Sequence, residues 1–562
     1  MGDFLSTSTD CKNWLGSPFW PSNIEWGSLN SSVSGRLIQP VPPGSVCHPS
    51  LSSYNEQACT SVQESWNESD FHANDPISVD FNNWTNDTCL PSPLLSCSGA
   101  GYPAYVVNTS SPLHVKAAVD FAREHEIRLV VKASGHDYLG RSSAPGALSI
   151  WVRHLTGAEF HTNFQPLGCD FGLNTTTVTV GGGMLMKDIL DVLQDKNLTA
   201  VTGASPDVAV GGYLTGGGHS ILSATQGLAA DNVVQVEMVT PQGDIVTANE
   251  CQNSDLFWAI RGGGGGTFGV ITKATLRTFP SPRIGSMALA ILLPTEDLLW
   301  EATTKLFQVT PALAKIGISG YIYAFPENSP FLQSGPVLLL SLVGVDQSAS
   351  QVLDSMKNTA IWTDFEKLLN STNSYPTLKD YNSHYAWWLD NVDKSPAGTN
   401  FMGASRLLNM EVLSQPFDKL KQALKAAAGS SGLNGILAAG PGVWNVSPRG
   451  GGNAVNPAWR NHTIIHLVLG ALWMPADAAQ EQEALAQLEQ RTQVLRELAP
   501  DSGCYVNEAW PNEPDFQRTF WGDQYERLEE IKREFDPADV FWCHPCVGNQ
   551  GWRQVSDRLC RV

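Results

Sequence analysis

The amino-acid sequence predicts an α+β protein with a glycine-rich first half and a second half built on an antiparallel sheet. Residues 98–281 alternate strand and helix patterns, and clusters of glycine follow several of the strand patterns. In residues 282–500 glycine becomes less frequent and apolar strand patterns alternate with helix patterns, which is typical of a separate α+β domain. We expect these two domains to be preceded by an extension at residues 1–97 and followed by a C-terminal segment at residues 501–562.

The length and composition are those of an ordinary globular protein. The chain has 562 residues, of which 42% are hydrophobic and 16% charged, so two or three domains with sizeable cores are expected. The formal net charge of -20 argues against nucleic acid or an anionic membrane as partner, because both require basic surface. No uninterrupted apolar run reaches about 18 residues, so no membrane-spanning helix is expected.

Cysteines and glycosylation sequons indicate the secretory pathway. The chain has 11 cysteines, crowded at both ends, and their odd number leaves at least one thiol without an intramolecular partner. Sequons of the form Asn-x-Ser/Thr occur at Asn30, Asn67, Asn83, Asn86, Asn108, Asn174, Asn197, Asn370, Asn445 and Asn461. The first residues lack the basic and apolar regions of a signal peptide, so we expect that the signal was removed from this numbering. A loose match to a myristoylation pattern at residues 1–6 contradicts the sequons and is not favoured.

The extension and the glycine-rich domain are expected to differ in regularity. Residues 1–97 are rich in Pro, Ser, Asn and Trp and predict an irregular, disulfide-pinned extension, which Trp14, Trp20 and Trp26 pack onto the body. In the glycine-rich domain, strands are predicted at 105–107, 127–131, 148–152, 175–180, 233–239 and 269–279, with helices from Ser111 or Pro112 through Ala122 and from Met186 through Leu193. Glycine clusters occupy 181–183, 211–218 and 262–266. Each glycine costs backbone entropy on folding, so this number indicates backbone lying close to a large ligand.

The second domain and the C-terminal segment show longer elements. Strands are predicted at 316–323, 337–343 and 464–473, and helices at 296–309, 348–356, 417–428, 476–498 and 525–535. Tyr381, His384, Tyr385, Trp387 and Trp388 form an aromatic cluster of the kind that lines an apolar pocket, although packing of the domain explains it equally well.

Common nucleotide and metal motifs are absent. Residues 264–269 match the letters G-x-G-x-x-G, but a strand pattern follows instead of a helix and no acidic residue stands at the expected spacing, so no Rossmann domain is expected. Cys543 and Cys546 form a lone C-x-x-C without the second pair that zinc needs. A structural disulfide is the favoured role for each cysteine, and no metal site is expected.

The stretch at residues 130–142 organises the functional argument. A short apolar strand leads into a glycine-punctuated loop whose backbone N–H groups can converge on an anion. His136 lies among small residues, where a bulky planar ligand could approach. A tight turn with a surface histidine is the structural alternative.

Three motifs in this part of the chain resemble one flavoprotein family. Lys132-Ala133-Ser134-Gly135-His136-Asp137-Tyr138, Gly203-Ala204-Ser205-Pro206-Asp207-Val208 and the glycines of 211–218 closely resemble the vanillyl-alcohol oxidase superfamily, within it the berberine-bridge-enzyme-like oxidases. The resemblance continues through 255–270, 505–507 and 525–541 and is weak in between. It implies a two-part PCMH-type FAD-binding domain at 98–281, a substrate domain at 282–500 and a C-terminal segment that completes the flavin site. The extension looks like that of secreted fungal members.

The resemblance implies FAD in an extended pose with one covalent bond. His136 matches the histidine that bonds to the flavin 8α-methyl group, whereas Ser205 stands where many relatives have a second, cysteinyl link to C6. This departure predicts a single covalent link and counts against the bicovalent oligosaccharide oxidases. The other positions expected to hold FAD are Lys132, Ser134, Gly135, Asp137, Gly140, Arg141, Ser142, Gly203, Ser205, Pro206, Val208, Gly211, Gly212, Gly216, Gly217, Val270 and Asn507. Glycine-loop N–H groups can neutralise the pyrophosphate of an acidic protein without a basic patch.

Four residues are candidates for catalysis. His219 ends the 216–218 glycine run, where several relatives have a tyrosine, and it suits a general base; a histidine bonded to a turn carbonyl is the alternative. Tyr138 and Tyr505 match family positions near the flavin ring, as a base or, preferably, an aromatic wall. Tyr505 and Asn507 are expected on one strand, facing the same side. His466 contacts substrate if its face of strand 464–473 looks at the flavin, and otherwise is an ordinary sheet histidine.

These expectations define a function. Val208 matches the position that gates oxygen in the family, and its small side chain favours an oxidase, although a core valine is the alternative. We expect an FAD-dependent oxidase that takes a hydride from an alcohol, phenol or amine, such as a secondary metabolite, to flavin N5 and is reoxidised by molecular oxygen to give hydrogen peroxide. A carbohydrate oxidase of the same fold and a catalytically silent flavin-binding protein are the alternatives. The sequence leaves substrate identity and oligomeric state open.

Overall fold

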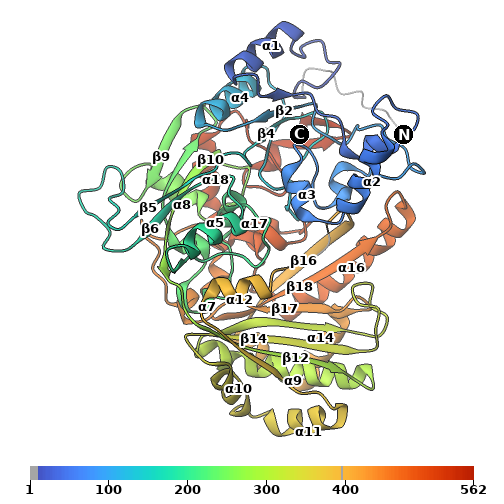
Figure 1. Cartoon of the computed structure of the whole chain (residues 1–562), viewed down its shortest axis with the longest axis vertical. Helices are drawn as coiled ribbons and strands as arrows, with labels where there is room; N and C mark the ends of the chain where they lie inside the picture. The colour runs from blue at the N-terminus through green and yellow to red at the C-terminus, as the bar shows by residue number, and fades with distance from the viewer. Residues whose placement is uncertain (1–10, 394–396) are drawn as a thin grey trace.

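The computed structural model describes residues 11–393 and 397–562. Two smaller sheets lie in the upper part of Figure 1, and one large antiparallel sheet lies in the lower part. This arrangement confirms the α+β class expected from the sequence. Residues 1–6, with their loose myristoylation match, lie outside the described residues.

The first sheet carries the loop of His136. Its strand order is β1 (Leu37–Ile38), β2 (Tyr105–Asn108), β4 (Leu148–Trp151), β3 (Leu129–Lys132), and β4 pairs in parallel with both β2 and β3. Helix α4 (Pro112–Glu124) connects β2 to β3, begins with Pro at its first position and buries the apolar stripe formed by Val115, Ala118, Val119 and Ala122. The loop leaves β3 at its carboxyl end.

The second sheet is antiparallel, with the order β5 (Ala158–His161), β6 (Thr177–Gly181), β10 (Val270–Arg277), β8 (Val233–Val239), β9 (Ile245–Asn249). Strand β10 follows residues 264–269 directly, so the G-x-G-x-x-G letters do not open a helix. Helices α5 (Met186–Gln194), α6 (Val210–Gly216) and α8 (Ser254–Ile260) belong to the same part of the molecule. The buried face of α5, formed by Met186, Ile189 and Leu193, joins the core of this sheet.

The third sheet has seven antiparallel strands in the order β15 (Thr377–Tyr381), β12 (Ile284–Leu292), β14 (Val337–Val345), β13 (Ile318–Phe325), β17 (Leu433–Leu437), β18 (Thr463–Trp473), β16 (Asn400–Asn409). One face packs on α9 (Glu296–Lys315), α10 (Ala349–Lys357), α14 (Phe417–Ala428) and α16 (Ala478–Leu498). The other face looks toward the glycine-rich part (Figure 1). Because side chains alternate along a strand, each central strand contributes to both faces.

Helix α9 extends beyond the expected end at Val309. Pro311 lies inside the helix and cannot donate a hydrogen bond to the Phe307 carbonyl. The Thr310 hydroxyl donates to that carbonyl instead, at 2.7 Å. This side-chain replacement lets the helix continue to Lys315, where Leu313 and Ala314 are buried.

The prediction of an irregular extension is wrong for three segments. Helices α1 (Asn23–Ser32), α2 (Glu56–Ser65) and α3 (Ser69–Asn74) form there. Their signal is local capping rather than periodicity: Ser22 and Glu25 make a reciprocal capping box at α1, and α2 has an Asn55 cap but no buried residue. Trp26 stacks on Tyr105 with ring centroids 3.9 Å apart and so packs the extension on the body.

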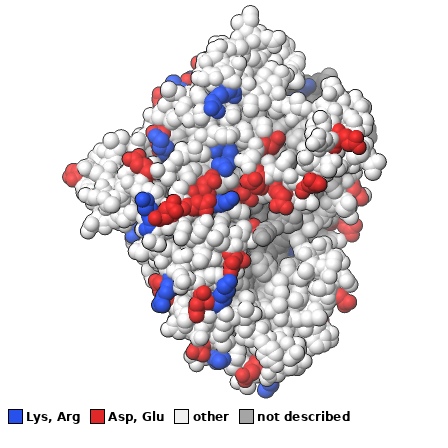
Figure 2. Space-filling model, viewed as in Figure 1, with Lys and Arg blue, Asp and Glu red and all other residues white. Residues whose placement is uncertain are grey.

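Five disulfides form among the described residues, and two of them, Cys11–Cys560 and Cys169–Cys251, join positions far apart in the sequence. The five disulfides pair Cys11 with Cys560, Cys47 with Cys59, Cys89 with Cys97, Cys169 with Cys251 and Cys543 with Cys546, and Cys504 is a buried thiol. The C-x-x-C pair is thus a disulfide, as favoured from the sequence. On the face in Figure 2, acidic side chains gather in a band across the middle of the molecule. No helix among the described residues is both long and apolar enough to cross a membrane.

The C-terminal segment returns to the glycine-rich part. Helices α17 (Phe516–Trp521) and α18 (Tyr525–Phe535) bury Phe520, Trp521 and Leu528 in the core of the second sheet. A hairpin of β19 (Trp552–Val555) and β20 (Arg558–Arg561) closes the chain. The remaining short elements are β7 (Leu198–Thr199), paired with β11 (Phe279–Pro280), and α7 (Ser223–Gln226), α11 (Trp362–Thr372), α12 (His384–Asp390), α13 (Met410–Leu413) and α15 (Pro441–Trp444).

Candidate active site

A cavity of about 580 Å³ lies between the glycine-rich part and the large sheet. The regions that line it include the loop after β3, the residues before and within α6, the glycine-rich stretch before β10, the end of α12, and the free face of the seven-stranded sheet. Tyr505, Asn507 and Glu508 of the C-terminal segment complete the lining. The surface is hollowed between the two parts on the face in Figure 2. The cavity therefore brings together segments that are far apart in the sequence.

The cavity collects most of the residues expected at the site. Those that line it are Ser134, Gly135, His136, Asp137, Tyr138, Arg141, Ser142, Gly203, Ser205, Val208, Gly211, Gly212, His219, Val270, Tyr505 and Asn507. The expected residues outside its lining are Lys132, Gly140, Pro206, Gly216, Gly217 and His466.

Lys132 stabilises the His136 loop from the buried side, outside the cavity lining. Its ammonium donates to the carbonyl oxygens of His72 at 3.0 Å, Asp75 at 2.9 Å and Ser134 at 3.3 Å. Burial lowers the pKa of Lys132 to about 8. The residue ties the loop to helix α3 of the extension.

The loop offers unpaired backbone donors. Gly135 and Gly140 have φ of +95° and +74°, and a Cβ on Gly140 would lie 2.4 Å from the Trp84 ring, so only glycine fits there. Among the described residues, no hydrogen bond occupies the N–H groups of Gly135, Asp137 and Tyr138. Such a loop can bind an anionic oxygen, as an FAD pyrophosphate requires.

The glycines near α6 have two distinct roles. At Gly212 nothing lies within 4 Å of the place a Cβ would take, so the backbone borders open space in the cavity that a bulky ligand can fill. A Cβ on Gly216 would lie 2.4 Å from the Asn507 side chain. Gly216 thus lets Asn507 of the C-terminal segment approach α6.

Arg141 joins the loop to the C-terminal segment. Its guanidinium donates to Asp137, with Nε at 3.0 Å from Oδ1, and to Asn507 Oδ1 at 3.0 Å. The Nη1 atom is buried and has no partner among the described residues. A free guanidinium donor beside unpaired loop N–H groups fits a bound phosphate, so the residues present fit FAD.

Asp80 of the extension holds His136. The His136 Nδ1 donates to Asp80 Oδ2 at 2.7 Å, and the Ser69 hydroxyl donates to the same oxygen at 2.7 Å. Burial alone would lower the pKa of His136, but the Asp80 carboxylate more than offsets this and raises it to about 9. The two side chains form an ion pair that fixes the imidazole at the cavity.

Glu508 binds two histidines. His219 Nε2 lies 3.1 Å from Glu508 Oε1, and His466 Nε2 lies 2.8 Å from Oε2. Burial would raise the pKa of Glu508, but the two histidines hold it far below its usual range. Burial lowers the pKa of His466, which is fully buried on β18, lies outside the cavity lining and binds the lining residue Glu508.

The expected strand around Tyr505 is wrong. Tyr505 caps a single 3-10 turn at Val506–Glu508, and no strand of residues 11–393 or 397–562 pairs with this segment. The turn still keeps the two predicted side chains together: Asn507 Nδ2 donates to the Tyr505 hydroxyl at 3.0 Å. Gly218 N–H donates to the same hydroxyl at 3.2 Å. Tyr505 packs edge-on against both His219 and His466, with centroids 5.3 and 5.5 Å away.

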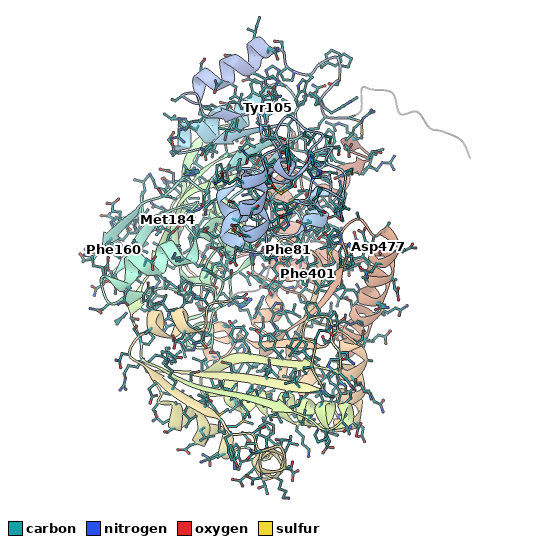
Figure 3. The ribbon with its side chains drawn as sticks, turned by 45° about the vertical axis from the view of Figure 1, so that its right-hand side comes forward. Phe81, Tyr105, Phe160, Met184, Phe401 and Asp477 are labelled. Atoms are coloured by element: carbon teal, nitrogen blue, oxygen red, sulfur yellow. A yellow bond between two sulfur atoms is a disulfide. The ribbon has the colours of Figure 1, made fainter. Side chains whose placement is uncertain are left out.

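Aromatic rings wall the cavity near His136. Phe81 of the extension lies 5.1 Å from Tyr138 and 5.2 Å from Phe401 of β16, measured between ring centroids. Figure 3 shows Phe81 and Phe401 side by side where the extension meets the large sheet. Of the predicted aromatic cluster on α12, Trp387 lines the cavity and Trp388 Nε1 donates to the Gly203 carbonyl at 3.1 Å.

Sequence reasoning missed Asp80, Glu508, Tyr321, Tyr323 and Asn434. Asp80 lies in an extension without a motif, so no signal marked it. Glu508 had a signal, because an acidic residue between Asn507 and Ala509 in a largely apolar run is unusual. The other three residues lie on strands of the second domain, where the family resemblance is weak.

Fold and site together define an FAD-binding flavoenzyme, and comparisons with known proteins agree. Residues 103–249 match the family model described as FAD binding domain, and residues 504–548 match that described as berberine and berberine like. The chain is 32% identical to FAD-linked oxidoreductase ZEB1 of Gibberella zeae, over 99% of this chain and 95% of that protein. It is 31% identical to VAO-type flavoprotein oxidase VAO615 of Thermothelomyces thermophilus, over 99% and 96% respectively.

A solved structure agrees with these relatives. The VAO-type flavoprotein MtVAO713 from Myceliophthora thermophila C1 superposes with a TM-score of 0.90 at 28% identity, covering 98% of this chain and all of that one. The chain belongs to the FAD-linked oxidoreductases of the vanillyl-alcohol oxidase type with a berberine-like C-terminal segment. The expected family, enzyme class and FAD cofactor are thereby confirmed.

Proposed function

We propose that this FAD-linked oxidoreductase takes a hydride from an alcohol, phenol or amine and passes the electrons to molecular oxygen, giving hydrogen peroxide. FAD, when bound, supplies the electron acceptor, with flavin N5 as the site that receives the hydride. The observation that carries the proposal is the hydrogen bond between His219 and Glu508 at the cavity. It equips the site with an oriented general base.

The pairing with Glu508 selects the tautomer of the His219 imidazole. A carboxylate only accepts hydrogen bonds, so Nε2 of His219 carries the proton and Nδ1 keeps a lone pair. No hydrogen bond from a described residue occupies that Nδ1. A substrate hydroxyl or amine can therefore transfer its proton to Nδ1 as the hydride leaves, and Glu508 stabilises the imidazolium that forms.

His466 acts as a positioning residue. Its hydrogen bond to Glu508 Oε2 fixes the carboxylate while His219 uses the other oxygen. Because burial lowers the pKa of His466, the His466 imidazole remains neutral near pH 7. The negative charge of Glu508 is therefore left to stabilise the positive charge that His219 acquires. Tyr505 and Tyr138 serve as aromatic walls in this proposal.

FAD is held by one covalent bond in this proposal. His136 would hold the flavin through its 8α-methyl carbon, and Asp80 would orient the imidazole ring by accepting the proton of Nδ1. Ser205 lines the cavity where a second, cysteinyl link would need a thiol, so its hydroxyl leaves the attachment single. Val208 also lines the cavity and, being small, leaves room for oxygen.

The chain is proposed to be a secreted glycoprotein. Its disulfides need an oxidising compartment, and several sequon asparagines are exposed, among them Asn67, Asn86, Asn174, Asn197, Asn370, Asn445 and Asn461. Asn83 is poorly placed for a glycan, because its side-chain oxygen accepts a hydrogen bond from the Phe401 N–H at 3.1 Å.

A substrate panel tests the function. Purified holoenzyme is supplied with alcohols, phenols, amines and oligosaccharides, and peroxide is measured beside anaerobic bleaching of the flavin. Turnover of a non-carbohydrate substrate that is lost in His219→Gln supports the proposal. Turnover of oligosaccharides alone would contradict it in favour of a carbohydrate oxidase, and a flavin that no substrate bleaches would indicate a silent flavoprotein.

A further inference from the structure

The face of the large sheet that borders the cavity has an aromatic surface. Along β13, Ile318, Ile322 and Ala324 point to the helices and are fully buried, whereas Tyr321 and Tyr323 alternate with them and line the cavity. The two tyrosine rings are nearly parallel, with centroids 6.3 Å apart and an interplanar angle of 13°. They form one continuous aromatic wall.

An unpaired amide lies beside this wall. Asn434 of β17 is the cross-strand partner of Tyr323 and also lines the cavity. No hydrogen bond from a described residue reaches its side chain, and its Oδ1 is buried without a partner. A buried polar atom without a partner is unfavourable, so an amide kept in this state indicates a ligand that pairs with it.

The wall carries no charge. The residues that the central strands add to the cavity are all uncharged: Tyr321, Tyr323, Ser341, Asn434, Ile436 and Val468. Of the two basic side chains on the opposite side, His136 pairs with Asp80, and Arg141 pairs with Asp137 and has its remaining donor, Nη1, assigned to the FAD phosphate. No unpaired cation among the described cavity residues is available to bind an anionic substrate.

The wall lies two strands away from His466, whose ring centroid is 5.5 Å from that of the proposed base His219. In the sheet register, Tyr321 pairs with Ile436, and Ile436 pairs with His466, the residue that holds Glu508. Neighbouring strands are about 4.8 Å apart, so Tyr321 and His466 stand about 10 Å apart across the sheet. One substituted aromatic ring spans such a distance.

We propose that Tyr321, Tyr323 and Asn434 form a subsite for the planar aromatic ring of an uncharged substrate, with the Asn434 amide pairing with a hydroxyl on that ring. This inference rests on the proposed function and names its substrate class: a phenolic compound whose oxidisable group reaches His219. The faces of the Tyr321 and Tyr323 rings would stack on the substrate ring, and the Asn434 amide would fix its orientation through a hydrogen bond.

Binding of dead-end probes tests the subsite without requiring turnover. Phenol, anisole, cyclohexanol and xylobiose are titrated into oxidised holoenzyme under anaerobic conditions, and perturbation of the flavin absorbance reports binding. We expect phenol to bind more tightly than anisole, and both more tightly than cyclohexanol and xylobiose. Because no probe needs to react, a failure of the proposed oxidase activity leaves this result readable.

Three variants separate the contributions. Tyr323→Leu should weaken phenol and anisole alike by about fivefold. Asn434→Leu should weaken phenol by about fivefold and leave anisole nearly unchanged, because only phenol donates a hydrogen bond. Phe325→Leu removes a ring from the same face of β13 but outside the cavity lining, and should change neither affinity by as much as twofold.

Several results would overturn the proposal. Equal affinities for phenol and cyclohexanol would show that the tyrosine rings do not contribute to recognition of the substrate. An Asn434→Leu effect of equal size on phenol and anisole would show a structural role for the amide. Tighter binding of xylobiose than of phenol, or no spectral change with any aromatic probe, would also refute the subsite.

Discussion

His219 and Glu508 are 289 residues apart in the sequence, yet the imidazole Nε2 of one lies 3.1 Å from a carboxylate oxygen of the other. The contact joins the end of the glycine run to the C-terminal segment. A carboxylate at this place can set the tautomer of the imidazole and share the charge that it acquires. Five substitutions test this contact and the other contacts of the site.

The substitution Glu508→Gln should slow anaerobic flavin reduction by about a hundredfold, because the amide keeps an acceptor for His219 but loses the charge that stabilises the imidazolium. Stopped-flow spectroscopy with a substrate from the panel measures the rate. Glu489→Gln is the matched control, since Glu489 pairs with Arg496 outside the cavity lining. An unchanged reduction rate in Glu508→Gln would remove the carboxylate from the proposed mechanism.

The substitution Asp80→Asn should reduce the fraction of covalently held flavin, which is read as fluorescence of the denatured protein band. The neutral amide no longer fixes the orientation of the His136 imidazole as the carboxylate does. In wild-type protein expressed without flavin and then supplied with FAD, attachment should accelerate as pH rises toward about 9, because the pKa of His136 is raised to that value and only the neutral ring is nucleophilic.

The same ion pair affects the stability of the flavin-free protein. A raised folded-state pKa means that the contribution of His136 is complete below its ordinary pKa and is lost as pH rises through about 9. Thermal unfolding should therefore show a smaller loss of Tm between pH 7 and about 10 in His136→Gln than in wild type. Parallel curves for the two proteins would contradict the pairing.

The substitution Lys132→Met should lower the free energy of unfolding by about 3 kcal/mol, because it leaves three buried carbonyl groups without their donor. Denaturant unfolding measures the change. Lys116→Met on the exposed side of α4 should cost less than about 0.5 kcal/mol. Equal costs would show that Lys132 does not organise the loop.

The substitution Gly212→Ala should raise the stability of the flavin-free protein by about 0.5–1 kcal/mol, as alanine does in a helix, and yet reduce its FAD content. The new methyl group has space only where the ligand is proposed to lie. Gly27→Ala in α1 also meets no atom within 4 Å and is helical, so it should give the same gain in stability with unchanged FAD content. Normal FAD content in Gly212→Ala would contradict the proposal that FAD lies against the backbone of Gly212.

Local patterns predicted much of the fold. Strand β8 and helix α14 begin and end where their periodicity places them, because both bury a regular apolar stripe. The extension was harder, since its helices depend on caps such as Ser22 and bury little. Helix α9 passes Pro311 through a threonine hydroxyl, a contact that periodicity does not reveal.

Site residues that belong to a recognisable sequence motif could be predicted. The loop of His136 and the start of α6 reach the cavity as expected, while Gly216 and Gly217 support the packing of other segments. Asp80 and Glu508 could not be assigned roles, because their meaning depends on partners 56 and 289 residues away in the chain. Asn434 is marked only by a missing hydrogen bond, which a sequence cannot show.

The disulfide between Cys11 and Cys560 joins residues 549 positions apart and so turns the covalent chain into a nearly closed ring. That ring contains the extension with Asp80, the loop with His136 and the turn with Glu508. It can close only after residue 560 has been made, so the covalent framework around the cavity is not finished until synthesis has passed Cys560. A variant that ends before Cys560 could not form this disulfide and would leave the Cys11 thiol without this partner.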